Sequence, residues 1–212
     1  MAEPSTSPVG RGRLEAFSDG VFSIVITLLV LDLRLPEGDV DSAGYLVWKI
    51  LALWPQYFGY VLSFLIVGIF WVAHHFIFHH IRRVDRPLLW MNILFLMALA
   101  FLPFPTTLIS RHWAWAPSVW AYGGTLCAAN LLLNAMWRYA TRGGRLVDPG
   151  LSPELVRDVN RRSLRAVAVY VAAMLVAAWS PRVGLAVFLI VHILYILPAA
   201  LDRHWTPKEN HP

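Results

Sequence analysis

The stretch RLEAFSDGVFSIVITLLVLDLRL, residues 13–35, opens with charged residues and then becomes almost wholly apolar. It is long enough to cross a bilayer as a helix, which needs roughly 20 residues. A carboxylate, Asp19, near the base of such a helix is energetically costly and therefore indicates a functional site. Ser18, Ser23 and Thr27 are small polar residues that need protein or water partners within a bilayer. These residues predict that the helix lies in the interior of a membrane protein.

The composition of the whole chain favours the same class. Of its 212 residues, 58% are hydrophobic and 15% are charged, whereas a soluble domain is about 25% charged. Apolar blocks recur along the chain, so the predicted fold class is all-α, a polytopic membrane protein with six transmembrane helices. The net charge of +5 comes from basic residues in the loops between these blocks, as membrane topology requires. No nucleic-acid motif is present, and no nucleic-acid partner is expected.

The predicted spans follow the apolar blocks, which are residues 13–34, 45–78, 88–109, 119–137, 167–179 and 185–201. The second block is longer than one crossing. Pro55 either kinks it or marks the true start of its span, and the preferred interpretation is a single kinked helix. Ser152 and Pro153 predict the start of a polar helix that leads into the fifth span.

The domain organisation predicted from these spans is a single membrane domain. Residues 1–10 are rich in Pro and Ser and predict a disordered tail, residues 11–203 form the six-helix domain, and residues 204–212 form a polar cytoplasmic tail. Six spans place both termini on one side. Of the 18 Lys and Arg residues, 14 fall on the side of the termini and 4 on the other side. This bias predicts that both termini are cytoplasmic.

The first helix has one apolar stripe. At 100° per residue, Ile24, Thr27, Leu28 and Leu31 fall within one arc of about 100°, together with Gly20. Asp19 points away from that arc. The stripe alone would also fit a helix that faces lipid or a neighbouring helix.

Three passages carry a resemblance to a known family. The run Arg13-x-x-x-Phe17-Ser18-Asp19, which opens the first helix, resembles the hallmark of the transmembrane protein 175 family. FWVAHHFIFHH (residues 70–80) and NILFLMALAFLPFPT (residues 92–106) are similar to further passages of that family. The prokaryotic branch consists of six-span potassium-permeable channels, and the likeness extends over essentially the whole chain.

The resemblance implies a homotetramer in the lipid bilayer of the cell (inner) membrane, with one first helix per subunit around a central pore for potassium ions. Ile24 would form the narrowest apolar ring. Thr27 or Leu28, and then Leu31, would form the next layers outward. The chain lacks a TVGYG run, so ions would be selected at an apolar constriction instead of a carbonyl filter. The resemblance implies no cofactor and no enzymatic activity.

The resemblance also implies a hydrogen-bonded network that anchors the pore helix. It would join Arg13, Phe17, Ser18 and Asp19 to Trp71 and a histidine near the end of the second span, His74 or His75. Trp71 and His75 are four residues apart and share a helical face, so His75 is the preferred partner. The predicted role of this network is structural.

Two other function classes remain as alternatives. His74, His75, His79 and His80 resemble one histidine box of a di-iron membrane oxidoreductase. Such enzymes need several boxes, and the other histidines are scattered, so no metal site is expected. A secondary transporter would need discontinuous helices in both halves of the chain, and only Pro103 and Pro105 hint at one. Asn92, Asn130, Asn134 and His192 lie within spans, and we expect each to form a hydrogen bond between helices.

Overall fold

The computed structural model describes residues 10–35 and 42–196, and the regular structure of these residues is helical. The predicted tails therefore lie outside the described residues, apart from Gly10. The end of the predicted sixth span, residues 197–201, also lies outside them. The helices are α1 (Arg11–Leu28), η1 (Leu29–Asp32), α2 (Ala43–Ala52), α3 (Trp54–His80), α4 (Arg86–Ala100), α5 (Pro103–His112), α6 (Ala116–Thr141), η2 (Arg142–Gly144), α7 (Pro153–Ala177) and α8 (Pro181–Ile196).

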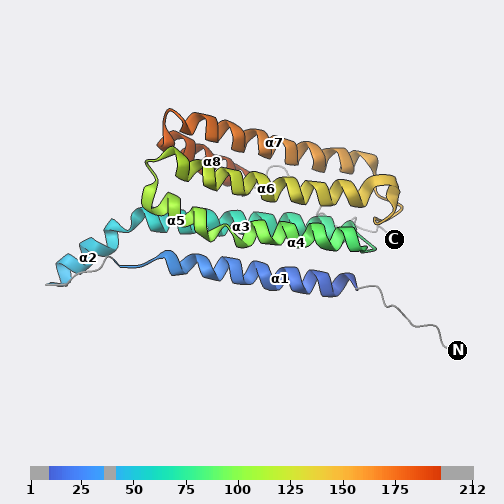
Figure 1. Cartoon of the computed structure of the whole chain (residues 1–212), viewed down its shortest axis with the longest axis horizontal. Helices are drawn as coiled ribbons and strands as arrows, with labels where there is room; N and C mark the ends of the chain where they lie inside the picture. Colours follow the sequence, from blue (N-terminus) through green and yellow to red (C-terminus); the bar gives the residue numbers. More distant parts are fainter. Residues whose placement is uncertain (1–9, 36–41, 197–212) are drawn as a thin grey trace, which may run out of the picture.

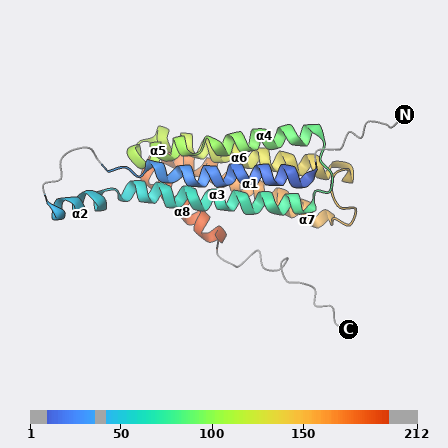
Figure 2. The same cartoon turned by 90° about the horizontal axis from the view of Figure 1, so that it is seen from below.

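The long helices lie side by side in one bundle (Figures 1 and 2). Helix α6 is central and contacts α4, α5 and α7, whereas α1 lies at one side and packs against α3 and α4. Among residues 10–35 and 42–196, three regions are long and apolar enough to cross a membrane, namely Arg11–Asp32, Trp54–His80 and Arg86–His112. The structure thus confirms the all-helical class, while the count of six spans stays a prediction.

Local sequence signals explain where several helices begin. Ser152 accepts a hydrogen bond from the backbone N–H of Leu155 at 3.1 Å, so the predicted cap of α7 is confirmed. Asp85 caps α4 in the same way through the N–H of Leu88. Each side chain satisfies a backbone donor that the first helical turn leaves without an intrahelical acceptor.

The second apolar block is not a single kinked helix, and that preference was wrong. Helix α2 ends at Ala52, Leu53 has non-helical angles (φ −75°, ψ 7°), and α3 begins at Trp54. Pro55 lies in the first turn of α3, where its missing N–H costs nothing because that donor would have no acceptor. Helix α2 extends beyond the end of the bundle (Figure 1).

The third block is also interrupted. Helix α4 ends at Ala100 and α5 begins at Pro103. A proline in the interior of a helix removes a hydrogen bond and clashes with the carbonyl four residues earlier. The block therefore breaks immediately before Pro103, where its ring fits the first turn of a new helix.

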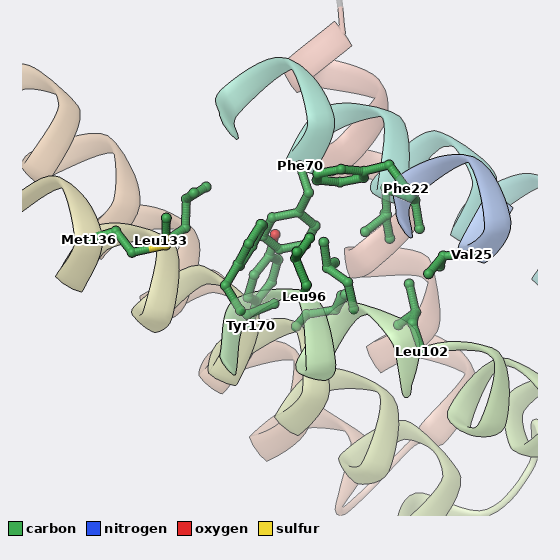
Figure 3. Close-up of a cluster of buried hydrophobic side chains, with 14 of the residues drawn as sticks. Phe22, Val25, Phe70, Leu96, Leu102, Leu133, Met136 and Tyr170 are labelled. Atoms are coloured by element: carbon green, nitrogen blue, oxygen red, sulfur yellow. The ribbon is translucent and has the colours of Figure 1, made fainter. Parts of the chain in front are cut away.

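The interior is a single apolar cluster formed by all the long helices. Phe22 and Val25 bring α1 into this cluster (Figure 3). Phe22 of α1 and Phe70 of α3 each approach the ring of Phe95 in α4, with ring centroids 6.1 Å apart. At the far side of the same view, Leu133 and Met136 of α6 lie deep in the bundle. Burial of such side chains is worth about 1.5–3 kcal/mol each in water, but within lipid their close packing has the larger effect.

Candidate functional site

Helix α1 has two faces with different environments. Its buried face consists of residues spaced three or four apart, namely Leu14, Ser18, Phe22, Val25 and, in η1, Leu29. The opposite face carries the predicted pore residues. Ile24 and Leu31 are each 58% exposed and Leu28 is 43% exposed, and Thr27 is also exposed. The described chain therefore covers these large apolar side chains only in part.

The hydroxyl groups of α1 bond back to its own backbone. Thr27 Oγ1 lies 2.9 Å from the carbonyl oxygens of Ser23 and Ile24, and Ser23 Oγ donates to the carbonyl of Asp19 at 2.8 Å. Such bonds satisfy the hydroxyls internally and tend to bend a helix. The α-helix changes to a 3₁₀ helix two residues after Thr27. The exposed face consequently presents mainly apolar groups.

A buried polar chain connects α1 to α3 through α4. Ser18 Oγ donates to the carbonyl of Leu14 and accepts from Asn92 Nδ2, each at 2.9 Å. Asn92 Oδ1 in turn lies 2.9 Å from His74 Nε2, so the histidine is the donor in this bond. Ser18 and Asn92 are fully buried and His74 is 2% exposed. Because each member satisfies the next, the chain fixes the position of α1 against both neighbouring helices.

Aromatic rings enclose the histidine of this chain. His74 stacks on Phe78 with ring centroids 4.4 Å apart and on Phe95 with centroids 5.7 Å apart. Phe22 of α1 approaches the same imidazole edge-on at 5.6 Å. This apolar cage keeps water away from the hydrogen bonds between the three helices.

A second contact between α1 and α3 lies on the exposed side. Trp71 Nε1 donates to Asp19 Oδ1 at 2.9 Å, and His75 stacks on the Trp71 ring with centroids 5.8 Å apart. The structure therefore assigns the two histidines different surroundings. His74, instead of the preferred His75, is joined to Ser18, because position 74 faces the bundle and position 75 faces outward.

The other two residues of the predicted network lie apart from these contacts. Arg13 and Phe17 are on exposed positions of α1, and Phe17 is 57% exposed. Within residues 10–35 and 42–196, Arg13 forms no hydrogen bond with Ser18 or Asp19. Both side chains lie outside the buried chain.

The histidines at the end of α3 do not gather into a ligand set. Among the described residues, no group of three or more His, Cys, Asp or Glu side chains is close enough to hold a metal ion. His79 and His80 contact each other edge-to-face, and His80 also approaches Phe76 and Trp137. Their environment is aromatic packing.

The far end of α1 has its own polar niche. Asp32, in η1, lies 3.6 Å from the Arg111 guanidinium of α5. A cavity of about 290 Å³ opens beside this pair and is lined by Leu28, Leu31 and Thr106 among others. The ion pair ties the last turn of α1 to α5.

The comparisons with known proteins identify the family. The sequence model of the family described as endosomal/lysosomal potassium channel TMEM175 matches residues 13–103. A potassium channel of Streptomyces collinus is 41% identical over 155 residues, which cover 71% of this chain and 74% of that protein. The chain belongs to the TMEM175 family. The family and these relatives are ion channels and not enzymes.

A solved structure and an animal relative extend this result. The crystal structure of a lysosomal potassium-selective channel TMEM175 homolog from Chamaesiphon minutus matches with a TM-score of 0.77 and 30% identity, covering 87% of this chain and 95% of that one. The endosomal/lysosomal proton channel TMEM175 of mouse is 42% identical over 103 residues, or 46% of this chain and 21% of that protein. The TMEM175 relatives thus carry names that refer to two different ions.

Sequence reasoning missed two members of the site. Asn92 was expected to bond between helices, and the structure confirms this, but its place between Ser18 and His74 was not foreseen. Phe22 was not singled out at all. Its spacing of four residues from Ser18 places it on the same helical face, and this signal would have found it.

Asn130, Asn134 and His192 also bond between helices as predicted, to Ser163, Asn160 and Tyr170.

Proposed function

We propose that this protein is a potassium-permeable channel of the cell membrane, formed by four copies around a pore that α1 lines. The observation that carries the proposal is the two-faced α1. One face is held by a buried hydrogen-bonded chain and an aromatic cage, and the other exposes Ile24, Leu28 and Leu31. An apolar face that the chain itself leaves largely exposed is a surface that a second copy would cover.

Ion selection in this proposal depends on the apolar face. Ile24 forms the narrowest ring, Thr27 or Leu28 the next layer, and Leu31 the layer beyond. An apolar ring closes by dewetting or makes the ion lose water as it passes. Potassium loses water at a lower cost than sodium, so the ring favours potassium modestly. The internal bonds of Thr27 support this reading because they turn its hydroxyl toward the helix backbone.

The remaining network residues keep α1 at a fixed rotation in this proposal. Asp19 points away from the pore residues and bonds to Trp71, so it orients the helix and does not bind the permeating ion. Arg13 and Phe17 lie on the exposed side of α1, where they would contact a neighbouring subunit. Removal of the Asp19 carboxylate would then impair assembly more than selectivity.

The orientation in the membrane follows from the distribution of charge. The α3–α4 loop, the α6–α7 loop and the first turn of α1 lie at one end of the bundle (Figure 1). Together with the helix segments that adjoin them, as residues 11–13, 79–87 and 138–165, they hold 12 of the 16 arginines. We place this basic end in the cytoplasm, together with both termini.

The test of the pore assignment is ion flux through liposomes that contain Ile24→Asn. A polar, hydrated ring lowers the barrier, and a decrease of only about 1.4 kcal/mol raises a rate tenfold. We therefore expect potassium flux to rise by roughly that factor and the preference over sodium to fall. Ile190→Asn is the matched control, because Ile190 is similarly exposed at 54% but lies on α8, on the far side of the bundle from α1 (Figure 1).

An unchanged flux and selectivity in Ile24→Asn, with the oligomer intact, would refute the assignment. Proton flux is measured in the same vesicles with a pH-sensitive dye, since one relative is named a proton channel. If the wild type carries protons and no potassium, the proposed potassium permeation is wrong. The pore location is then tested by comparing proton flux in Ile24→Asn and Ile190→Asn.

A further inference from the structure

A second cavity lies at the basic end of the bundle, away from α1. It measures about 460 Å³ and is lined by Arg138, Tyr139, Thr141, Arg142 and Asn160. The first four residues come from the end of α6 and the turn that follows, and Asn160 comes from α7. No carboxylate is among these lining residues, so the cavity carries two positive charges and no negative one.

The two carboxylates of the adjoining loops, Asp85 and Asp148, are already engaged elsewhere. Asp85 accepts from Tyr139 Oη at 2.7 Å and lies 3.6 Å from Arg145. Asp148 accepts from Arg82 at 2.6 Å. Within the part of the chain that the structure describes, neither arginine of the cavity forms an ion pair. Their positive charge is therefore available to a ligand.

The donors at the cavity fit an oxyanion. Arg138 and Arg142 each present a planar fork of N–H groups, which binds phosphate oxygens in pairs. Asn160 Oδ1 accepts a hydrogen bond from Asn134. The two N–H groups of the Asn160 amide therefore lie on the side away from Asn134. Thr141 donates to the carbonyl of Trp137, so the arginines and Asn160 supply the donors.

The predicted fourth span, residues 119–137, lies within α6 and would place the cavity at the level of the lipid headgroups. Helix α6 contains 26 residues and is therefore about 39 Å long at 1.5 Å per residue. This exceeds the hydrocarbon thickness of about 30 Å, so the end of α6 would reach the headgroup layer if α6 forms the predicted fourth span. Basic clusters at this level attract anionic lipids on the cytoplasmic side.

We propose that this cavity is a binding site for a phosphate group, held by Arg138, Arg142 and Asn160, with an anionic phospholipid headgroup or a free phosphate as its source. The inference does not depend on which ion the protein conducts. A bound phosphate would bridge α6 to α7 at the basic end.

The experiment measures binding of short-chain phosphatidylglycerol to the purified full-length oligomer in neutral detergent. Charge-assisted hydrogen bonds from two arginines are lost in Arg138→Gln/Arg142→Gln, so we expect the Kd to rise about tenfold or more. The matched control is Arg83→Gln/Arg86→Gln, which removes the same charge from the α3–α4 region at the same end of the bundle. It should leave the Kd unchanged.

Equal losses in the two double variants would overturn the proposal, because binding would then follow the overall charge. If Arg138→Gln/Arg142→Gln does not assemble, Arg138→Lys/Arg142→Lys keeps both charges and removes the forks. Weaker binding by the lysine variant supports the site, and unchanged binding overturns it.

Inorganic phosphate, at constant ionic strength, distinguishes the sources. Saturable binding of inorganic phosphate to the wild type without lipid, lost in Arg138→Gln/Arg142→Gln and competing with phosphatidylglycerol, indicates that a free phosphate can occupy the cavity. Binding of phosphatidylglycerol without such competition indicates a lipid headgroup. Binding of neither ligand would refute the site.

Discussion

At the scale of single residues, Asn92 has the central position in the buried polar chain. Its amide donates to Ser18 of α1 and accepts from His74 of α3, so one side chain of α4 joins three helices. No water reaches these groups in a bilayer, and an unsatisfied polar group there is costly. The rotation of α1, and with it the direction of the proposed pore face, depends on this residue.

We expect Asn92→Leu to destabilise the protein by about 1–3 kcal/mol, because it leaves buried His74 Nε2 without its acceptor and removes one of the two hydrogen bonds of Ser18 Oγ. Thermal unfolding in detergent measures the loss. Asn134→Leu is the control, since the side chain of Asn134 has a single hydrogen bond among the described residues, to Asn160. Interhelical bonds of this kind averaged about 0.6 kcal/mol where they were measured in a membrane protein. Equal effects of the two substitutions would contradict the central role of Asn92.

At the scale of elements, small residues decide how closely α7 and α8 approach. A Cβ atom added at Gly184 would lie 2.8 Å from the carbonyl oxygen of Ala173 and 2.8 Å from Ala177 Cβ. The first of these is a backbone atom, which cannot turn away as a long side chain can. Small residues at helix interfaces permit such approach in membranes.

Gly184→Ala should therefore force the two helices apart and cost about 1–3 kcal/mol, as overpacking does in cores. Gly124→Ala on α6 is the control, because an added Cβ there meets nothing within 4 Å and should be neutral or favourable by up to about 1 kcal/mol. Denaturation measures the free energy of unfolding of each variant relative to the wild type. A neutral Gly184→Ala would show that α8 can move without cost.

At the scale of the whole molecule, two distant loops close the basic end. The Arg82 N–H donates to the carbonyl of Leu146 at 2.7 Å, and the Asp148 N–H donates to the carbonyl of His80 at 3.2 Å. Ile81 and Val147 form a bridge between the same loops. The Arg82 side chain adds an ion pair with Asp148. These contacts join the α3–α4 half of the bundle to the α6–α7 half.

The ion pair makes this closure sensitive to acid. The Arg82 guanidinium, followed by the N–H of Gly150, holds the pKa of the Asp148 carboxyl below its ordinary value of 3.8. The contribution of this ion pair to stability is therefore fully present above pH 3.8. It is lost as the pH falls through the lower pKa of Asp148 in the folded state. Hydrogen exchange should show Asp148→Asn weakening protection of residues 81–83 at neutral pH, and acid treatment of the wild type should have the same effect.

Asp158→Asn serves as the control for this measurement, because Asp158 lies exposed on α7. At every pH, the exchange of residues 81–83 in this variant should equal that of the wild type. If Asp148→Asn likewise had no effect, the backbone bonds alone would hold the loops together.

The sequence by itself determined the properties that depend on neighbours along the chain. Composition predicted a helical membrane protein, Ser152 predicted its cap, and the period of α1 separated Ile24 from Asp19. Only the tertiary structure decided which side chains of different helices meet. It joined His74 to Asn92, placed His75 on Trp71 and divided the second block at Leu53. The reason is physical: a shift of one residue turns a helical side chain by 100°, and only packing against other helices fixes that rotation.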